Sequence, residues 1–202
     1  MKGRTNSMTN TLTATVLTPA ELEQGHLYLR QTRDLVLGAT SGLSKAQWNF
    51  KPAPERWSIA ENVEHMVIIQ DLVLGPMRDQ LAAAPADAGD RDYKQVDGMV
   101  MSQFAVRLEK YPNPEITNPT GRWATEALMA RLLENYERLA AYIDNTPDIR
   151  QHVIEAAPLK ALTKGKFTVM DGYQWALAAG AHNERHVKQM LEVKADPAFP
   201  SN

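Results

Sequence analysis

The chain has 202 residues, of which 44% are hydrophobic and 23% charged, and its formal net charge is −2. This balance is typical of one domain with a sizeable core, and the absence of a basic block argues against nucleic acid as a partner. There is no cysteine, which excludes disulfides, a cysteine nucleophile, thiolate zinc sites and iron–sulfur clusters. Any metal ligands must therefore be His, Asp or Glu.

The N-terminal segment lacks the apolar run of about seven or more residues that a secretory signal needs. No stretch of the sequence approaches the roughly 18 apolar residues of a membrane span. The sequence therefore predicts a cytoplasmic protein with no membrane partner. We expect residues 1–16 to form a disordered tail and residues 17–200 to form a single domain.

The first two predicted helices each begin with a capping signal. Thr18-Pro19-Ala20-Glu21 combines an N-cap residue, a proline suited to the first helical position and an acidic capping partner, and predicts a helix that runs to about Thr40. Ser58-Ile59-Ala60-Glu61 is a second capping box, followed by a helix that runs toward Leu81. We expect Gly75-Pro76 to kink or end this helix, because Pro76 lacks the N–H donor and clashes with the preceding turn.

The other two predicted helices lie in the second half of the chain. A stripe of apolar residues at helical spacing predicts a helix from about Thr125 to Asp144. Asp171-Gly172-Tyr173-Gln174 is a third capping signal, and the helix that follows is expected to end near Lys194.

Two long connectors join these helices, and no alternating strand pattern exceeds a few residues. We expect residues 83–122, which contain several prolines, to be a largely irregular connector over one end of the bundle that shapes a pocket mouth, with a short helix at about 93–109. Residues 147–170 join the last two helices. Four amphipathic helices of about 20 residues predict an all-α fold, an antiparallel or crossed four-helix bundle.

Two histidines four residues apart, His182 and His186, are the most informative feature of the sequence. Positions i and i+4 of a helix lie on one face, so both imidazoles can bind a single ion. Both histidines fall on the expected core seam of the last helix, where a buried polar group needs a partner. The alternative is a pair of hydrogen-bonded or surface histidines with no metal.

His65 lies two turns inside the second predicted helix, at a depth that allows it to reach the same level of the bundle. Glu61, one turn earlier on the same face, has two alternative roles: it could orient His65, bind the metal or act as a catalytic base, or it could serve only as the capping partner of Ser58. Gln189, one turn beyond His186, is either a support for the metal ligands or a simple helix former. His26 is interpreted as a surface residue, and no role is assigned to His152.

Two motifs resemble elements of the DinB-like superfamily. One is Trp57-Ser-x-x-Glu61-x-x-x-His65, and the other is His182-x-x-x-His186-x-x-Gln189. The resemblance extends over roughly residues 18–200 in the order of elements, although only these two motifs are specific. It implies a four-helix bundle in which His65, His182 and His186 bind a divalent metal. Relatives include thiol-dependent enzymes such as bacillithiol transferases and mycothiol-dependent isomerases, and some members are dimers.

These observations favour a metal-dependent enzyme, a thiol-dependent transferase or a hydrolase, that acts on a small-molecule substrate. A bound Zn, Ni or Fe ion with three protein ligands and an open position would acidify a water or a low-molecular-weight thiol cosubstrate. The alternatives are a non-enzymatic metal-binding or stress-related bundle, and a helical interaction protein without metal. A homodimer is a further expectation that the resemblance adds.

Overall fold

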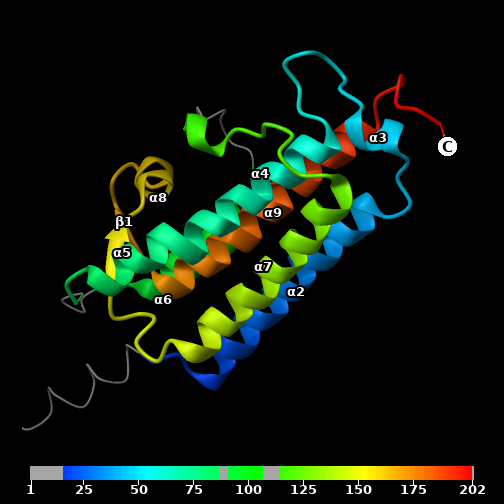
Figure 1. The fold of residues 1–202 in the computed structure, drawn as a ribbon. Coiled ribbons are helices and arrows are strands. Elements are labelled where there is room, and N and C mark those ends of the chain that lie inside the picture. The colour runs from blue at the N-terminus through cyan, green and yellow to red at the C-terminus, as the bar shows by residue number, and fades with distance from the viewer. Residues whose placement is uncertain (1–15, 87–90, 107–113, 202) are drawn as a thin grey trace, which may run out of the picture.

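The computed structural model describes residues 16–86, 91–106 and 114–201. It is a bundle of four long helices, with smaller elements packed around it (Figure 1). The four long helices are α2 (Pro19–Thr40), α4 (Ile59–Leu72), α7 (Thr125–Asn145) and α9 (Gly172–Lys194). The sequence-based prediction of an all-α four-helix bundle is confirmed.

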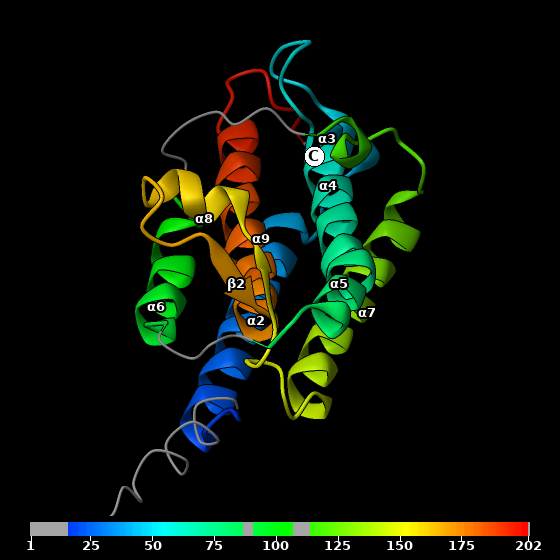
Figure 2. The same ribbon diagram turned by 90° about the vertical axis from the view of Figure 1, so that its left-hand side faces the viewer.

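The helix directions are not those of a simple up-and-down bundle. Helix α2 packs against α7 and α9, and α4 packs against the same two helices. Both views show α2 and α9 running in one direction and α4 and α7 in the other (Figures 1 and 2). The pairs α2–α9 and α4–α7 are therefore parallel neighbours. Because α4 and α7 are parallel, the chain between them has to return along the whole length of the bundle.

The helices begin where the capping signals predict. Thr18 and Ser58 each accept a hydrogen bond from the backbone N–H three residues later, and the side chains of Glu21 and Glu61 reciprocate. Asp171 and Gln174 form the same arrangement at the start of α9. Each box satisfies two N–H groups that a helix end leaves without partners. The helices are held together by apolar side chains that are almost completely buried, including Val36, Val63, Val67, Leu132, Leu139, Leu177 and Met190.

The Gly75-Pro76 pair neither ends nor reverses the second long helix. The chain passes through one π-helical turn, η1 (Val73–Met77), and continues as α5 (Arg78–Ala83). A π turn accommodates a proline inside a helix because the local hydrogen-bond ladder is already interrupted. The predicted interruption is present, and the helix extends two residues beyond the predicted Leu81.

Several short elements accompany the four long helices, and of these only α6 (Tyr93–Gln103) was predicted. Ser44 and Gln47 form a capping box that begins the short helix α3. Strand β1 pairs with β2 in antiparallel register, with Ile154 opposite Met170, and an isolated bridge joins Ala86 to His152. The short elements are α3 (Lys45–Asn49), α6 (Tyr93–Gln103), the 3₁₀ turn η2 (Glu115–Thr117), β1 (Val153–Glu155), α8 (Ala157–Leu162) and β2 (Val169–Asp171).

The connector between α4 and α7 differs from the prediction. It does not lie over one end of the bundle, because its helix α6 packs along the side of α9. This follows from the parallel α4 and α7, which require the connector to span the length of the bundle. The helix was expected at about 93–109, and the structure forms it over Tyr93–Gln103. Residues 87–90 and 107–113 of this connector, and residues 1–15 of the predicted tail, lie outside the described part of the chain.

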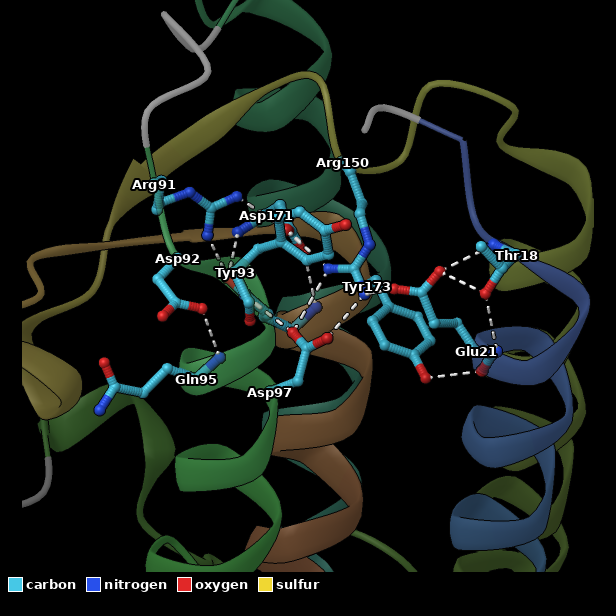
Figure 3. Close-up of polar contacts among 11 residues, drawn as sticks. Thr18, Glu21, Arg91, Asp92, Tyr93, Gln95, Asp97, Arg150, Asp171 and Tyr173 are labelled. Carbon is cyan, nitrogen blue, oxygen red and sulfur yellow. Dashed lines mark hydrogen bonds and ion pairs between the residues drawn. The ribbon is translucent and has the colours of Figure 1, made fainter. Parts of the chain in front are cut away.

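A buried cluster of charges around Arg150 fixes α6 to the bundle (Figure 3). Arg150 Nη2 lies 2.7 Å from Asp97 Oδ2 on α6 and 3.0 Å from Glu21 Oε1 on α2. Its Nη1 lies 3.1 Å from Asp171 Oδ2, at the start of α9. The guanidinium also lies between the rings of Tyr93 and Tyr173, at 4.6 and 4.5 Å from their centroids. One cation thus joins three helices at one end of the bundle.

The charges of this cluster shift one another's pKa values toward the charged forms. The pKa of the Arg150 guanidinium is raised: burial acts to lower it, but the three carboxylates outweigh burial. Burial acts to raise the pKa of Glu21, yet hydrogen bonds from Thr18 and the charge of Arg150 hold that pKa below its ordinary value. Asp97 differs, because burial raises its pKa despite Arg150. The cluster is a paired, structural arrangement of buried charge.

Among the described helices, none combines the length and the apolar character that crossing a bilayer requires.

Candidate metal centre

The structure brings His65, His182 and His186 together between α4 and α9. Because α4 and α9 run in opposite directions, the first part of α4 faces the second half of α9. The Nε2 atom of His182 lies 3.1 Å from Nε2 of His65 and 3.2 Å from Nε2 of His186. One ligand atom from each of the three histidines can be chosen so that all lie within 4.8 Å of one another. The three side chains share one point of convergence.

Hydrogen bonds at the far side of two rings determine where their protons lie. His65 Nδ1 is 2.7 Å from the backbone carbonyl of Thr117, and a carbonyl can only accept, so Nδ1 carries the proton. His186 Nδ1 is 2.8 Å from Asn62 Oδ1. The amide of Asn62 is oriented by its own Nδ2, which donates to the carbonyl of Ser58 at 2.8 Å. In a neutral imidazole the second nitrogen then carries a lone pair, and in both rings that nitrogen is the converging Nε2.

The third ring completes an electron-rich centre. His182 Nδ1 is buried and has no hydrogen-bond partner among the described residues. If His182 carries its proton on Nε2, this N–H can donate well to only one of the two facing lone pairs, those of His65 and His186. If it carries the proton on Nδ1, three Nε2 lone pairs face each other. A divalent ion removes this conflict, because each Nε2 becomes a ligand. In a tetrahedral zinc site with zinc–nitrogen bonds of about 2.1 Å, two ligand nitrogens lie about 3.4 Å apart. The two short Nε2 separations are close to this distance. The donor set fits a metal.

Burial favours the neutral form of two of these rings, His65 and His182. It lowers the pKa of the His65 imidazole, against the opposing effect of the Thr117 carbonyl, and the charge of Arg185 lowers it further. Burial also lowers the pKa of His182 well below its ordinary value, aided by His65 and Arg185. Neutral imidazoles are the form that binds metal, so the surroundings favour the competent state at neutral pH.

Trp57 forms one wall of the histidine cluster. Its ring stacks on His186 with a 5.9 Å centroid separation and a 21° interplanar angle, and it lies 4.8 Å from the ring of His65. Trp57 directly precedes the Ser58 cap, so the start of α4 determines its position. The indole limits the orientations of two of the three imidazoles.

Glu64 supports the carbonyl that holds His65. Its carboxylate accepts hydrogen bonds from the backbone N–H groups of Thr120 and Gly121, at 3.0 and 2.8 Å, and from the side chain of Arg122 at 3.1 Å. Burial acts to raise the pKa of Glu64, but these backbone hydrogen bonds and Arg122 lower it overall. Glu64 thereby fixes the segment that carries Thr117 beside α4.

The structure places the remaining predicted residues as follows. Glu61 serves as the cap: one carboxylate oxygen accepts from the backbone N–H of Ser58 at 2.7 Å, and the other pairs with Lys51 at 2.9 Å. Glu61 is not among the three residues of the histidine cluster; its contacts are those of the capping role, and a catalytic role stays a prediction. Gln189 is half-buried and lines the cavity beside the cluster. His26 pairs with Asp144 at the surface, at 2.7 Å.

The histidines open onto a cavity of about 830 Å³. This volume lies within the usual range of pockets for small molecules. The cavity is bounded by α4 and η1, by α9 and by α8, and the end of α6 also contributes to it. The expectation that residues 83–122 help to shape the pocket agrees with the lining by Gln103, Phe104 and Thr117.

Sequence reasoning missed the groups that orient the rings. Asn62 lies three residues before His65 and could have been noticed as a polar residue on the face of α4 that carries the site. Thr117 contributes only its backbone carbonyl, which no side-chain motif reveals. Glu64 was hidden by its neighbour Glu61, whose capping spacing was the stronger signal.

Comparisons with known proteins agree with this geometry. A family model described as the DinB superfamily matches residues 28–190. The chain is 26% identical over 154 residues to the uncharacterized protein YuaE of Bacillus subtilis (strain 168), a match that covers 76% of this chain and 86% of that protein. Among solved structures it is similar to YfiT from Bacillus subtilis, described as a probable metal-dependent hydrolase with an unusual four-helix bundle topology. That similarity has a TM-score of 0.51 at 10% identity and covers 91% of each chain; at this identity it shows the fold.

Proposed function

The chain belongs to the DinB superfamily, and we propose that it is a metal-dependent enzyme that acts on a small molecule. His65, His182 and His186 are the proposed ligands of a divalent ion. The observation that carries this proposal is the convergence of three Nε2 atoms at the wall of a cavity, where the two outer rings are oriented with lone pairs inward.

A divalent ion bound there supplies Lewis acidity and acidifies a bound water or thiol. Hydrolysis is the first candidate reaction, supported by the description of YfiT as a probable metal-dependent hydrolase. Three neutral imidazoles suit Zn, Ni or Fe. Within the described residues, no Asp, Glu or further His joins the three histidines, which supports an open position for water or substrate.

The protein's own residues provide orientation and shielding. The Thr117 carbonyl and the Asn62 amide hold the Nδ1–H groups, so that His65 and His186 present Nε2 to the cavity. Trp57 covers one side of the cluster and limits the access of water there. The cavity beside the cluster favours an enzyme over a bundle in which the ion serves only to join helices.

Transfer to or from a low-molecular-weight thiol is the second candidate. The cavity volume of about 830 Å³ favours it, because this space is large enough for two reactants. In that case the thiol would bind as thiolate, with the histidine cluster at the junction of the two reactants. A cytoplasmic location, a homodimer and the absence of a nucleic-acid partner stay predictions.

The test begins with metal analysis of protein purified without a histidine tag or a nickel column. We expect about one divalent ion per chain in the wild type and none in His182→Ala. Metal-loaded wild type and His186→Ala are then compared in a screen of ester, amide and phosphoester hydrolysis and of thiol conjugation to electrophiles. Turnover by wild type alone supports the proposal, and equal turnover by both proteins contradicts it for the reactions tested.

A further inference from the structure

The cavity changes character at the histidines. It follows α9 over several turns, since residues from Trp175 to Val193 line it. On the side toward the end of α9, the lining includes Arg56 and Gln189. On the side toward the start of α9, the described lining side chains are apolar apart from the indole N–H of Trp175. The histidines therefore lie between a polar part and an apolar part of one cavity.

The apolar part, here named the apolar lobe, has two facing walls. One wall belongs to α4 and η1, and the other to α8. The side chains that form these walls are Ile69, Leu72, Met77, Ala157, Pro158 and Ala161. Within this described lining no charged side chain interrupts the walls. The buried indole N–H of Trp175, at the far end of the lobe, is the one side-chain donor there without a partner among the described residues. A polar ligand would therefore lose hydration with at most one donor in return.

The lobe exists because of two local features. The face of α9 beneath it carries the small residues Ala178 and Ala179, which leave space where larger side chains would fill the core. The outer wall is α8, whose Leu159 is fully buried while Ala157 and Ala161 are exposed. Helix α8 is thus anchored by one face and presents an apolar face to the cavity. Apolar surface in a concave site is typical of ligand pockets.

We infer that the substrate has an apolar body, an aryl or medium-length alkyl group, attached to a small polar group that reaches the histidines. This inference rests on the proposed function, since it takes the histidine cluster as the reactive end. His182 and Trp175 are seven residues apart on α9, which places the far end of the lobe about 10 Å from the cluster at the helical rise of about 1.5 Å per residue. The apolar body occupies that length.

The test measures binding of two hydroxamates to the zinc-loaded protein by calorimetry. Acetohydroxamate and octanohydroxamate share a metal-binding head and differ by six methylenes. Each buried methylene is expected to tighten binding by about two- to fourfold, so octanohydroxamate should bind at least about fiftyfold more tightly. Affinities within about threefold of each other would overturn the inference.

Variants locate the effect within the lobe. Ala161→Trp is expected to weaken octanohydroxamate binding by at least about tenfold and to leave acetohydroxamate within about twofold, which also shows that the variant is folded. Ala157→Trp, on the same face of α8, should change the two affinities in the same way. Ala141→Trp, at an exposed position of α7 outside the cavity, is the matched control and should bind both ligands as the wild type does. If Ala161→Trp weakens the binding of both hydroxamates by the same factor, the alkyl chain does not bind in the apolar lobe.

The two proposals can fail separately. If acetohydroxamate binds the zinc-loaded protein but chain length has no effect, the metal site stands and the apolar lobe fails. If the protein takes up Ni or Fe instead of zinc, the hydroxamates are measured with that ion. If it takes up none of the three, the proposed function fails, and 1-octanol binding by the metal-free protein decides the lobe. If the wild type binds 1-octanol and Ala161→Trp does not, the apolar lobe is upheld. If the wild type does not bind 1-octanol, the apolar lobe is overturned.

Discussion

Helix α9 carries two polar clusters that are built in opposite ways. At its start, Asp171 joins the Arg150 cluster, where the cation meets carboxylates from three elements. Three turns further along, His182 and His186 belong to a cluster whose nitrogens face one another without opposite charges. The first cluster is complete in its charges, although Arg150 Nε has no hydrogen-bond partner among the described residues. The second cluster would be completed by the proposed ion. Buried polar groups that satisfy each other indicate structure, and buried groups left in conflict indicate a ligand.

The largest expected effect comes from breaking the complete cluster. Arg150→Met removes the cation that Glu21 and Asp97 face, while Asp171 keeps its ion pair with Arg91 at 2.8 Å. Because two buried or half-buried carboxylates lose their partner, we expect a loss of about 3–5 kcal/mol in the free energy of unfolding. Urea denaturation measures this. The control is Arg78→Met, which removes an exposed pair with the adjacent Asp79 and should change stability by no more than about 0.5 kcal/mol. A loss below about 1 kcal/mol in the free energy of unfolding of Arg150→Met would show that the cluster contributes little to the stability of the fold.

Removal of metal should reveal the incompleteness of the second cluster. At a free metal concentration 100 times the dissociation constant, binding to the folded state alone adds about 2.7 kcal/mol, which a chelator should abolish. In His182→Ala the stability should not respond to metal or to chelator. His26→Ala, which alters a surface histidine paired with Asp144, should respond as the wild type does. The same response in His182→Ala would contradict the site.

A smaller effect is expected from the groups that orient the ligands. Asn62→Leu keeps the side-chain size but removes the acceptor of His186 Nδ1–H, and loss of such a partner typically weakens metal affinity about 10–100-fold. Competition with a chromophoric chelator measures the affinity. Asn145→Leu, on the exposed end of α7, is the control. Unchanged affinity in Asn62→Leu would mean that the Asn62 amide does not hold the ring.

The smallest expected effect is a pH dependence of the chelated protein. Burial lowers the pKa values of His65 and His182, whereas in the unfolded chain these imidazoles titrate near their ordinary value of about 6.5. Below that pH the unfolded state takes up more protons, so stability should fall from pH 7.5 to 5.5, by at most about 1.4 kcal/mol per pH unit for each such proton. Urea denaturation at several pH values measures this slope. His182→Ala should show a shallower slope, and an equal slope would assign the protons to other groups.

The contrast between the Arg150 cluster and the histidine cluster also explains which features could be predicted from the sequence. The histidines of the incomplete cluster stand out because their spacing, four residues on one helix, is a local property. The long helices were predictable for the same reason, since capping boxes at Thr18, Ser58 and Asp171 are read within four residues. Helix α3 carried the same signal at Ser44 and Gln47, which was overlooked.

The Arg150 cluster was not predicted, because its members come from four separate segments and no spacing links them. The parallel arrangement of α4 and α7 was missed as well, since helix patterns carry no direction. The strands β1 and β2 have three residues each, which is too short for an alternating pattern to be recognised. These features depend on contacts between distant segments, which a single sequence does not reveal.

The pairing of α2 with α9 has a consequence for how the protein is made. Helix α2 leaves the ribosome well before its bundle neighbour α9, and α4 likewise waits for the histidines of α9. During translation the apolar faces of α2 and α4 therefore stay partly uncovered until α9 has emerged, a state that favours aggregation and chaperone binding. An ion cannot be captured by all three histidines before that moment. Uptake of the proposed metal would thus follow the synthesis of α9, and the availability of the ion would influence how much newly made chain reaches the folded state.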